Sequence, residues 1–155
     1  MAKCKNPRCT VCPKLRLTKT IHNKLCKVNV VIPKYKKPLT CNDKRVVYAI
    51  KCSKCHEAYV GQMMRALRAR IAQHLDCIET KTTHHMSHHF NKSHEIKHFN
   101  FLPLEKIEDN IPPREAKKLL QQKETYWTFH FTTLRYELPP KEYNKKAKMN
   151  QTHRL

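Results

Sequence analysis

In two short segments of the chain, residues 45–50 and 57–61, the residue types alternate along the sequence as they do in a β-strand. A brief polar stretch separates the two segments. Both are rich in β-branched and aromatic residues, a pattern that predicts a β-hairpin. Because every second side chain of a strand points to the same face, Tyr48 and Tyr59 can lie on one face of this hairpin. Residues 99–104 predict a third strand, in which Pro103 favours an edge position.

Residues 65–78 place apolar side chains at helical spacing and therefore predict an amphipathic helix. Arg70 and His74 are four residues apart, so they share a neighbouring face of this helix. The apolar stripe consists of Leu67, Ile71, Leu75 and Ile78.

A second helix is predicted to start at Pro112-Pro113-Arg114-Glu115 and to run to about Phe131, since proline and an acidic residue occupy its first turn. One face of this helix is apolar except for Glu124. A carboxylate on such a stripe must be paired, protonated or bound to a metal. The apolar members of the face are Leu120, Trp127 and Phe131.

The length of 155 residues suits one domain with appended segments. We expect a basic, cysteine-rich linker over residues 1–41, a compact domain over 42–140 and a basic disordered tail over 141–155. Residues 1–40 contain eleven Lys or Arg and no acidic residue. The linker has too few large apolar residues to fold unaided.

The chain carries 32 Lys and Arg against 12 Asp and Glu, a formal net charge of +20. Such an excess favours a polyanionic partner, because it would otherwise only destabilise the fold through self-repulsion. We expect DNA, or else RNA; an anionic membrane is the weaker alternative, since no long apolar run or amphipathic anchor accompanies the charge. No apolar stretch of a signal peptide follows the basic start, so a nuclear or cytoplasmic, reducing location is expected.

Eight cysteines in a chain without a secretory signal favour metal binding over disulfides. A CxxC pair falls between the two hairpin strands, and a histidine pair with a zinc-type spacing follows the first helix. We expect this set to hold a structural Zn²⁺, with His85 or His88 as substitutes for His89. The alternative is a pair of buried free cysteines beside a solvated histidine run. The four expected ligands are Cys52, Cys55, His89 and His94.

A second zinc set precedes the hairpin, with Cys26 or His22 as competitors for its fourth place. Structural zinc supplies on the order of 10 kcal/mol to such modules, which would explain how so polar a segment folds. Cys77 falls in a helical pattern and reads better as a packed small hydrophobe. The second set consists of Cys4, Cys9, Cys12 and Cys41.

The only glycine of the chain is Gly61, at the end of the second predicted strand. Glycine is the default residue where φ is positive or where another group approaches closely. Two phenols beside a bare backbone suggest a phosphate pocket; the alternative is a hairpin with two core or surface tyrosines.

Cleavage of a phosphodiester requires an activated water, a cation on the phosphate oxygens and help for the leaving oxygen. Glu124 could hold a Mg²⁺ ion, Arg70 could hold the phosphate, and a tyrosine phenol could relay a proton. Each residue alone has a simpler interpretation: Arg70 as a solvated residue, His74 as a surface histidine and Glu124 as a salt-bridge partner.

The order of these residues resembles the GIY-YIG nuclease family. The two family motifs correspond to Val46-Val47-Tyr48 and Tyr59-Val60-Gly61, the arginine helix to Arg70-x₃-His74, and the metal-binding stretch to residues 123–127. The cysteines between the two motifs, with Ser87-His88-His89-Phe90 and His94, are similar to the endonuclease domain of Penelope-like retroelements. The cysteines further upstream look like the linker before that domain.

The resemblance implies a small α/β (α+β) fold, in which helices flank a three-stranded antiparallel sheet. It implies a Mg²⁺ or Mn²⁺ ion on Glu124, with Tyr48 as base, Tyr59 assisting and Arg70 stabilising negative charge. His74 and His84 would contact the phosphate. The residues expected to contact nucleic acid are Gly61, Arg65, Arg68 and His84.

Three departures from the family pattern accompany the resemblance. Val-Val replaces Gly-Ile in the first motif, Gln62-Met63 follows the second motif, and Glu137-Leu138-Pro139 occupies the place of the expected Gly-Leu-Asn, with Asn144 a few residues later. The predicted function is a metal-dependent DNA endonuclease that nicks DNA, either a fragment of an element or a standalone relic. The alternative is a catalytically inactive, zinc-stabilised nucleic-acid-binding protein derived from such a nuclease.

Overall fold

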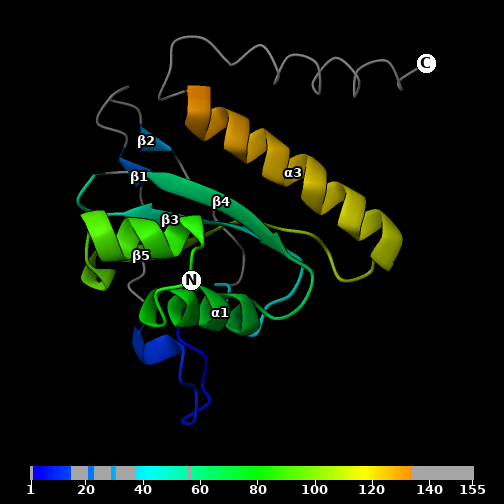
Figure 1. Cartoon of the computed structure of the whole chain (residues 1–155). Helices are drawn as coiled ribbons and strands as arrows, with labels where there is room; N and C mark the ends of the chain where they lie inside the picture. The colour runs from blue at the N-terminus through cyan, green and yellow to red at the C-terminus, as the bar shows by residue number, and fades with distance from the viewer. Residues whose placement is uncertain (1, 15–20, 23–28, 31–37, 56, 134–155) are drawn as a thin grey trace.

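A computed structural model describes residues 2–14, 21–22, 29–30, 38–55 and 57–133 of the chain. Within these residues, a three-stranded antiparallel sheet with the order β4-β3-β5 forms the centre of the fold (Figure 1). The strands are β3 (Val46–Cys52), β4 (Ala58–Met63) and β5 (Phe99–Lys106). The predicted hairpin and third strand are therefore confirmed, and β5 lies at an edge as Pro103 indicated.

The register of the sheet places Tyr48 of β3 directly opposite Gly61 of β4 and Pro103 of β5. The β3–β5 pairing is irregular next to Pro103, where the partner of Val47 is Glu105 and one residue is skipped. Proline has no backbone N–H to donate to a neighbouring strand, so an irregular edge is the place where it is tolerated.

Two longer helices cover the two faces of the sheet (Figure 1). α1 (Leu67–Glu79) packs its predicted stripe against the sheet face that carries Tyr48. α3 (Pro113–Thr133) packs on the other face and contacts mainly β4. The α+β architecture with helices on both faces is thus present. The buried members of the α3 face include Leu120, Trp127 and Phe131, as predicted.

Shorter elements complete the described part of the chain. α2 (His85–His88) continues into a π-helical turn, η2 (His89–Ser93), and then into a 3₁₀ turn, η3 (Ile96–His98). Near the amino terminus lie a 3₁₀ turn, η1 (Cys12–Lys14), and a small antiparallel pair, β1 (Ile21–His22) with β2 (Asn29–Val30). None of the described helices is both long and apolar enough to cross a membrane.

The amino-terminal segment packs against the main domain. Residues 2–14, here called the knuckle, lie on the side of α1 that faces away from the sheet (Figure 1). Val11 of the knuckle and Leu39 are each only 5% exposed and belong to the same hydrophobic core as α1. Cys26 and the predicted tail, including residues 137–139 and Asn144, lie outside the described residues.

Candidate active site and metal centres

The hydroxyl group of Tyr48 is the centre of a buried hydrogen-bond network between the sheet and α1. Its oxygen accepts a hydrogen bond from Arg70 Nε at 3.0 Å and lies 2.8 Å from His74 Nε2. Tyr48 is fully buried, and His74 is 2% exposed. Because Arg70 and His74 are one helical turn apart, α1 presents both to the same phenol.

Burial determines the protonation states in this network. Burial, with the nearby charges of Arg70 and His84, lowers the pKa of His74 to about 4, so its imidazole is neutral at pH 7. Burial also raises the pKa of Tyr48 to about 12, although Arg70 opposes this shift. Arg70 already donates to the phenol oxygen, so the phenol proton points to His74 Nε2 as the acceptor.

The depressed pKa of His74 predicts a loss of stability in acid. Between the ordinary pKa of 6.5 and the folded value of about 4, the unfolded chain binds a proton that the folded protein does not. Within this window, each unit by which the pH falls should lower the free energy of unfolding by up to about 1.4 kcal/mol. Urea unfolding at several pH values measures the slope, and His74→Gln should flatten it. An equal slope in both proteins would contradict the expectation.

Gly61 lies directly beneath the ring of Tyr48. A Cβ atom at this position would be 2.6 Å from the hydroxyl oxygen and 2.8 Å from the adjacent ring carbon, Cζ, closer than non-bonded atoms approach. No glycine among the described residues has a positive φ. Close approach, and not backbone conformation, is therefore the reason for glycine here, and the group that approaches is the phenol of Tyr48.

We expect Gly61→Ala to destabilise the protein by about 1–3 kcal/mol, the usual cost of overpacking a core. The phenol cannot move aside freely, because its ring stacks on Phe101 with centroids 5.0 Å apart. Gln62→Ala, on the opposite face of β4, is the control, and denaturant unfolding is the measurement. In a Tyr48→Ala background the same glycine replacement should cost almost nothing. A full cost in that background would show that the phenol is not the obstacle.

Two more of the predicted residues lie close to this network. The ring of Tyr59 lies 5.9 Å from the ring of His74, and the ring of His84, the residue before α2, lies 6.3 Å from the ring of His74. Burial alone would lower the pKa of Arg70, but the two tyrosine hydroxyls raise this pKa above the ordinary value. Arg70 therefore interacts with both phenols.

Glu124 reaches the same region from α3. It interacts electrostatically with Arg70 and Tyr48, and burial raises its pKa while Arg70 partly offsets that shift. α3 lies across the sheet from α1, but β4 is an edge strand, so side chains of the two helices can approach each other around it. The carboxylate of Glu124 is therefore within electrostatic range of the arginine and the phenol.

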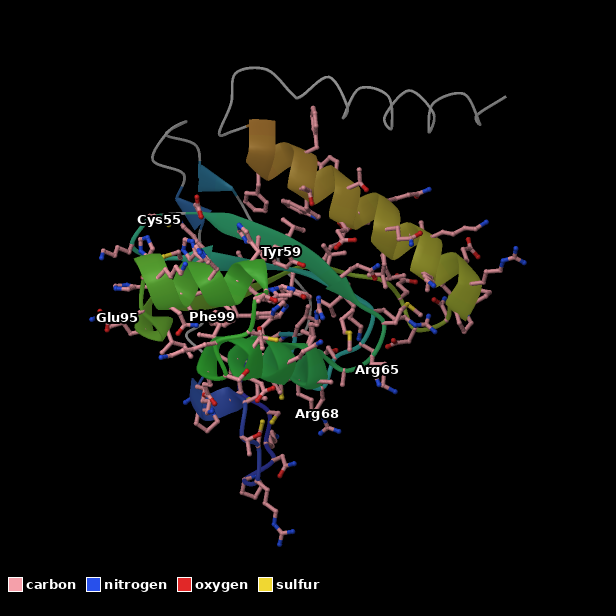
Figure 2. All side chains as sticks on the ribbon, in the orientation of Figure 1. Cys55, Tyr59, Arg65, Arg68, Glu95 and Phe99 are labelled. Carbon is pink, nitrogen blue, oxygen red and sulfur yellow. The ribbon has the colours of Figure 1, made fainter. Side chains whose placement is uncertain are left out.

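Two other predicted residues lie away from this network. Arg65 and Arg68 are exposed, and Figure 2 shows Arg68 projecting from the side of α1 that faces away from Tyr59. A residue that the sequence interpretation overlooked is Gln73, whose Oε1 accepts a hydrogen bond from Arg70 Nη1 at 2.6 Å. The three-residue spacing on a helix was the available signal.

The predicted cysteine–histidine centre is assembled at the far end of the hairpin, where Figure 2 labels Cys55. Its four ligand atoms all lie within 4.8 Å of one another, so this group could hold a metal ion. His85 and His88 line the neighbouring hollow but do not belong to the group. The members are Cys52, Cys55, His89 and His94.

Two further observations fit a metal at the cysteine–histidine centre. Glu57 lies 3.0 Å from His89 Nδ1, which leaves Nε2 free to act as a ligand, the usual arrangement behind a metal-bound histidine. His94 Nδ1 is buried without a hydrogen-bond partner in the described structure, which is costly unless a metal or another group satisfies it. Burial lowers the pKa of His89 despite Glu57, which favours the neutral, ligating form.

The predicted four-cysteine centre joins the knuckle to Cys41 and could also hold a metal ion. Its neighbouring sulfur atoms are 3.6–3.7 Å apart. A tetrahedron with Zn–S bonds of ~2.3 Å has edges of ~3.8 Å, whereas a disulfide would need ~2.0 Å. The spacing therefore fits a tetrathiolate zinc site.

Backbone N–H groups support the four-cysteine centre. The N–H of Cys12 donates to Cys9 Sγ, which lowers the pKa of Cys9 to about 6 and favours the thiolate that binds metal. The N–H of Cys4 donates to Cys12 Sγ. Cys77 of α1 is partly buried and belongs to neither metal centre.

Glu124 is not part of any group of three or more metal-ligating side chains among the described residues.

Comparison of the chain with protein-family models, curated proteins and solved structures finds no match.

Proposed function

We propose that the chain is a metal-dependent DNA endonuclease of the GIY-YIG type, which hydrolyses a phosphodiester bond. The observation that carries the proposal is the contact of Tyr48 with both Arg70 and His74, beside Tyr59 and within electrostatic range of Glu124. This grouping supplies a cation for the phosphate, a proton path and one carboxylate for a metal. The strongly basic composition suits a nucleic-acid substrate.

Arg70 is proposed to stabilise the negative charge that develops on the phosphate. Two of its nitrogens are fixed, Nε by Tyr48 and Nη1 by Gln73. The planar guanidinium therefore has a defined orientation before substrate binds, and preorganised charge of this kind accelerates phosphoryl chemistry. Its partial exposure leaves it accessible to a phosphate oxygen.

Tyr48 and His74 are proposed to form the proton path. With a pKa of about 12, Tyr48 is a neutral phenol at pH 7, so it accepts a proton from water only as its own proton moves to His74. The charge of Arg70 is one cause of the low proton affinity of His74. A phosphate bound to Arg70 offsets that charge and makes the transfer easier.

Glu124 is proposed to hold the divalent ion, Mg²⁺ or Mn²⁺. A single carboxylate suits Mg²⁺, which commonly keeps several waters and takes its other ligands from substrate phosphates. When bound, the ion would polarise the phosphate and lower the pKa of a bound water. Burial raises the pKa of this half-buried carboxylate and Arg70 offsets the shift only in part, so a bound cation would further stabilise its charged form.

Nicking of supercoiled plasmid tests the proposal. Wild-type protein with Mg²⁺ or Mn²⁺ should convert supercoiled plasmid to open circles, and EDTA should prevent this. The EDTA arm should be short, because prolonged chelation would also remove structural zinc. Failure to nick with either ion would refute the enzyme assignment.

The complete burial of Tyr48 favours a second candidate, a zinc-stabilised nucleic-acid-binding protein without catalysis. In that case the hydrogen bonds of Tyr48 only hold α1 on the sheet. Such a protein would bind DNA with a steep salt dependence and would never nick it. The plasmid assay separates the two candidates directly.

A further inference from the structure

Three exposed cationic residues are immediate sequence neighbours of ligands in the four-cysteine centre. Lys3 and Lys5 flank Cys4, and Arg8 precedes Cys9. Neighbouring Cα atoms are about 3.8 Å apart, and the four ligand atoms lie within 4.8 Å of one another. A metal at this centre would therefore fix the backbone positions of three positively charged residues close to one point.

Arg68 adds a fourth cation from α1. Its Nη1 donates to Asn42 Oδ1 at 3.2 Å, and Asn42 directly follows the ligand Cys41. The backbone N–H of Arg68 also donates to the carbonyl oxygen of Cys41 at 2.7 Å. The four-cysteine centre is therefore attached to the first turn of α1, two residues before Arg70.

The positive charge of these four residues exceeds the negative charge of a zinc ion bound by four thiolates. A zinc ion with four thiolates carries a net charge of about −2, so four cations leave a net positive charge. Within the described residues, no ion pair involves these cations, whereas Lys14 of the knuckle pairs with Glu79 at 2.8 Å. The first 42 residues contain no acidic residue. The cations are Lys3, Lys5, Arg8 and Arg68, here called the knuckle surface.

We propose that the knuckle surface binds the phosphate backbone of duplex DNA and that metal in the four-cysteine centre holds it in place relative to Arg70. The choice of duplex DNA rests on the proposed nuclease function. Arg68 and Arg70 project from different sides of one helix, whose diameter with side chains is about 10–12 Å. This is about the width of the major groove, ~12 Å, so the two sides can contact phosphates that flank one groove.

The test measures binding separately from cleavage. Fluorescence anisotropy of a labelled duplex, in a Glu124→Gln background without added divalent ion, gives the affinity at several salt concentrations. Replacing Lys3, Lys5 and Arg8 with alanine gives what is here called the knuckle variant. In a plot of the logarithm of the binding constant against the logarithm of the salt concentration, its slope should be about 2.7 smaller in magnitude than that of the wild type, since each phosphate contact contributes about 0.9. The affinity should fall about equally for all sequences, because phosphate contacts carry no sequence information.

The matched control removes the same charges from α3, which lies on the other side of the sheet. Arg114, Lys117 and Lys118 are all exposed, and their alanine variant also loses one arginine and two lysines. Its slope should change by less than about 1. An equal loss in both variants, or none in the knuckle variant, would overturn the proposal. Equal knuckle-dependent binding of single-stranded DNA or duplex RNA would overturn the assignment to duplex DNA.

A second variant tests the role of the metal. Cys4→Ser with Cys9→Ser should release one zinc ion per chain and weaken duplex binding at least as much as the knuckle variant does. If this variant loses its zinc but keeps the wild-type salt slope, metal does not hold the surface. Binding results stand whether or not wild-type protein nicks plasmid, so they fail or succeed independently of the nuclease proposal.

Discussion

Replacing Glu124 with glutamine is expected to abolish Mg²⁺-dependent nicking while the protein still folds and binds DNA. The change keeps the shape of the side chain but removes the charge that would hold a divalent ion. Because burial raises the pKa of Glu124, a neutral amide is easier to bury there, so the thermal stability should be unchanged or higher. The measurements are plasmid nicking, duplex binding and thermal unfolding.

Glu115→Gln is the matched control for this variant, because Glu115 is an exposed carboxylate in the first turn of the same helix. It should nick at the wild-type rate. Arg70→Ala should lose about 10²–10³-fold in rate, the usual cost of removing a preorganised donor to developing charge. Tyr48→Phe should lose about 10²–10⁴-fold, as expected for a proton-transfer group. Nicking by Glu124→Gln at the wild-type rate would show that the proposed metal ligand is wrong.

Replacing Cys52 and Cys55 with serine is expected to remove one of two zinc ions and to unfold the domain. Cys52 is the last residue of β3 and is 1% exposed, so its loss affects the sheet directly. A structural zinc contributes on the order of 10 kcal/mol, comparable with the whole stability of a small domain. Metal analysis after gel filtration gives the zinc content, and circular dichroism gives the fold.

Cys77→Ser is the control for the loss of a thiol, because Cys77 belongs to neither metal centre. It should retain both zinc ions and the wild-type melting temperature within a few degrees. If the Cys52 and Cys55 variant keeps two zinc ions, or loses one without loss of stability, the cysteine–histidine centre is not a structural zinc site.

Most of the secondary structure could be predicted because side-chain periodicity reports burial directly. The stripe from Leu67 to Ile78 packs on the sheet as its spacing indicated. The predicted start at residue 65 was two residues early. α1 begins at Leu67 because its first amides donate to the backbone carbonyls of Asp43 and Cys41, a contact that no local pattern reveals.

The membership of both metal centres could also be predicted, since ligand type and spacing restrict the choice. Their supporting residues could not. Glu57 is one of several acidic residues in the domain, and only the fold places it beside His89. His74 was considered as a surface histidine or as a phosphate contact, but the structure buries it against Tyr48. Burial and hydrogen-bond partners depend on tertiary packing, which sequence spacing does not specify.

The fit of the Tyr48 ring over Gly61 also has a consequence for folding. If β4 slipped by one residue along β3, every side chain of β4 would turn to the other face of the sheet. After a slip of either one or two residues, the phenol would face a residue that carries a Cβ atom, because the chain has no other glycine. The tyrosine–glycine pair therefore favours one pairing of the hairpin strands over its one- and two-residue shifts.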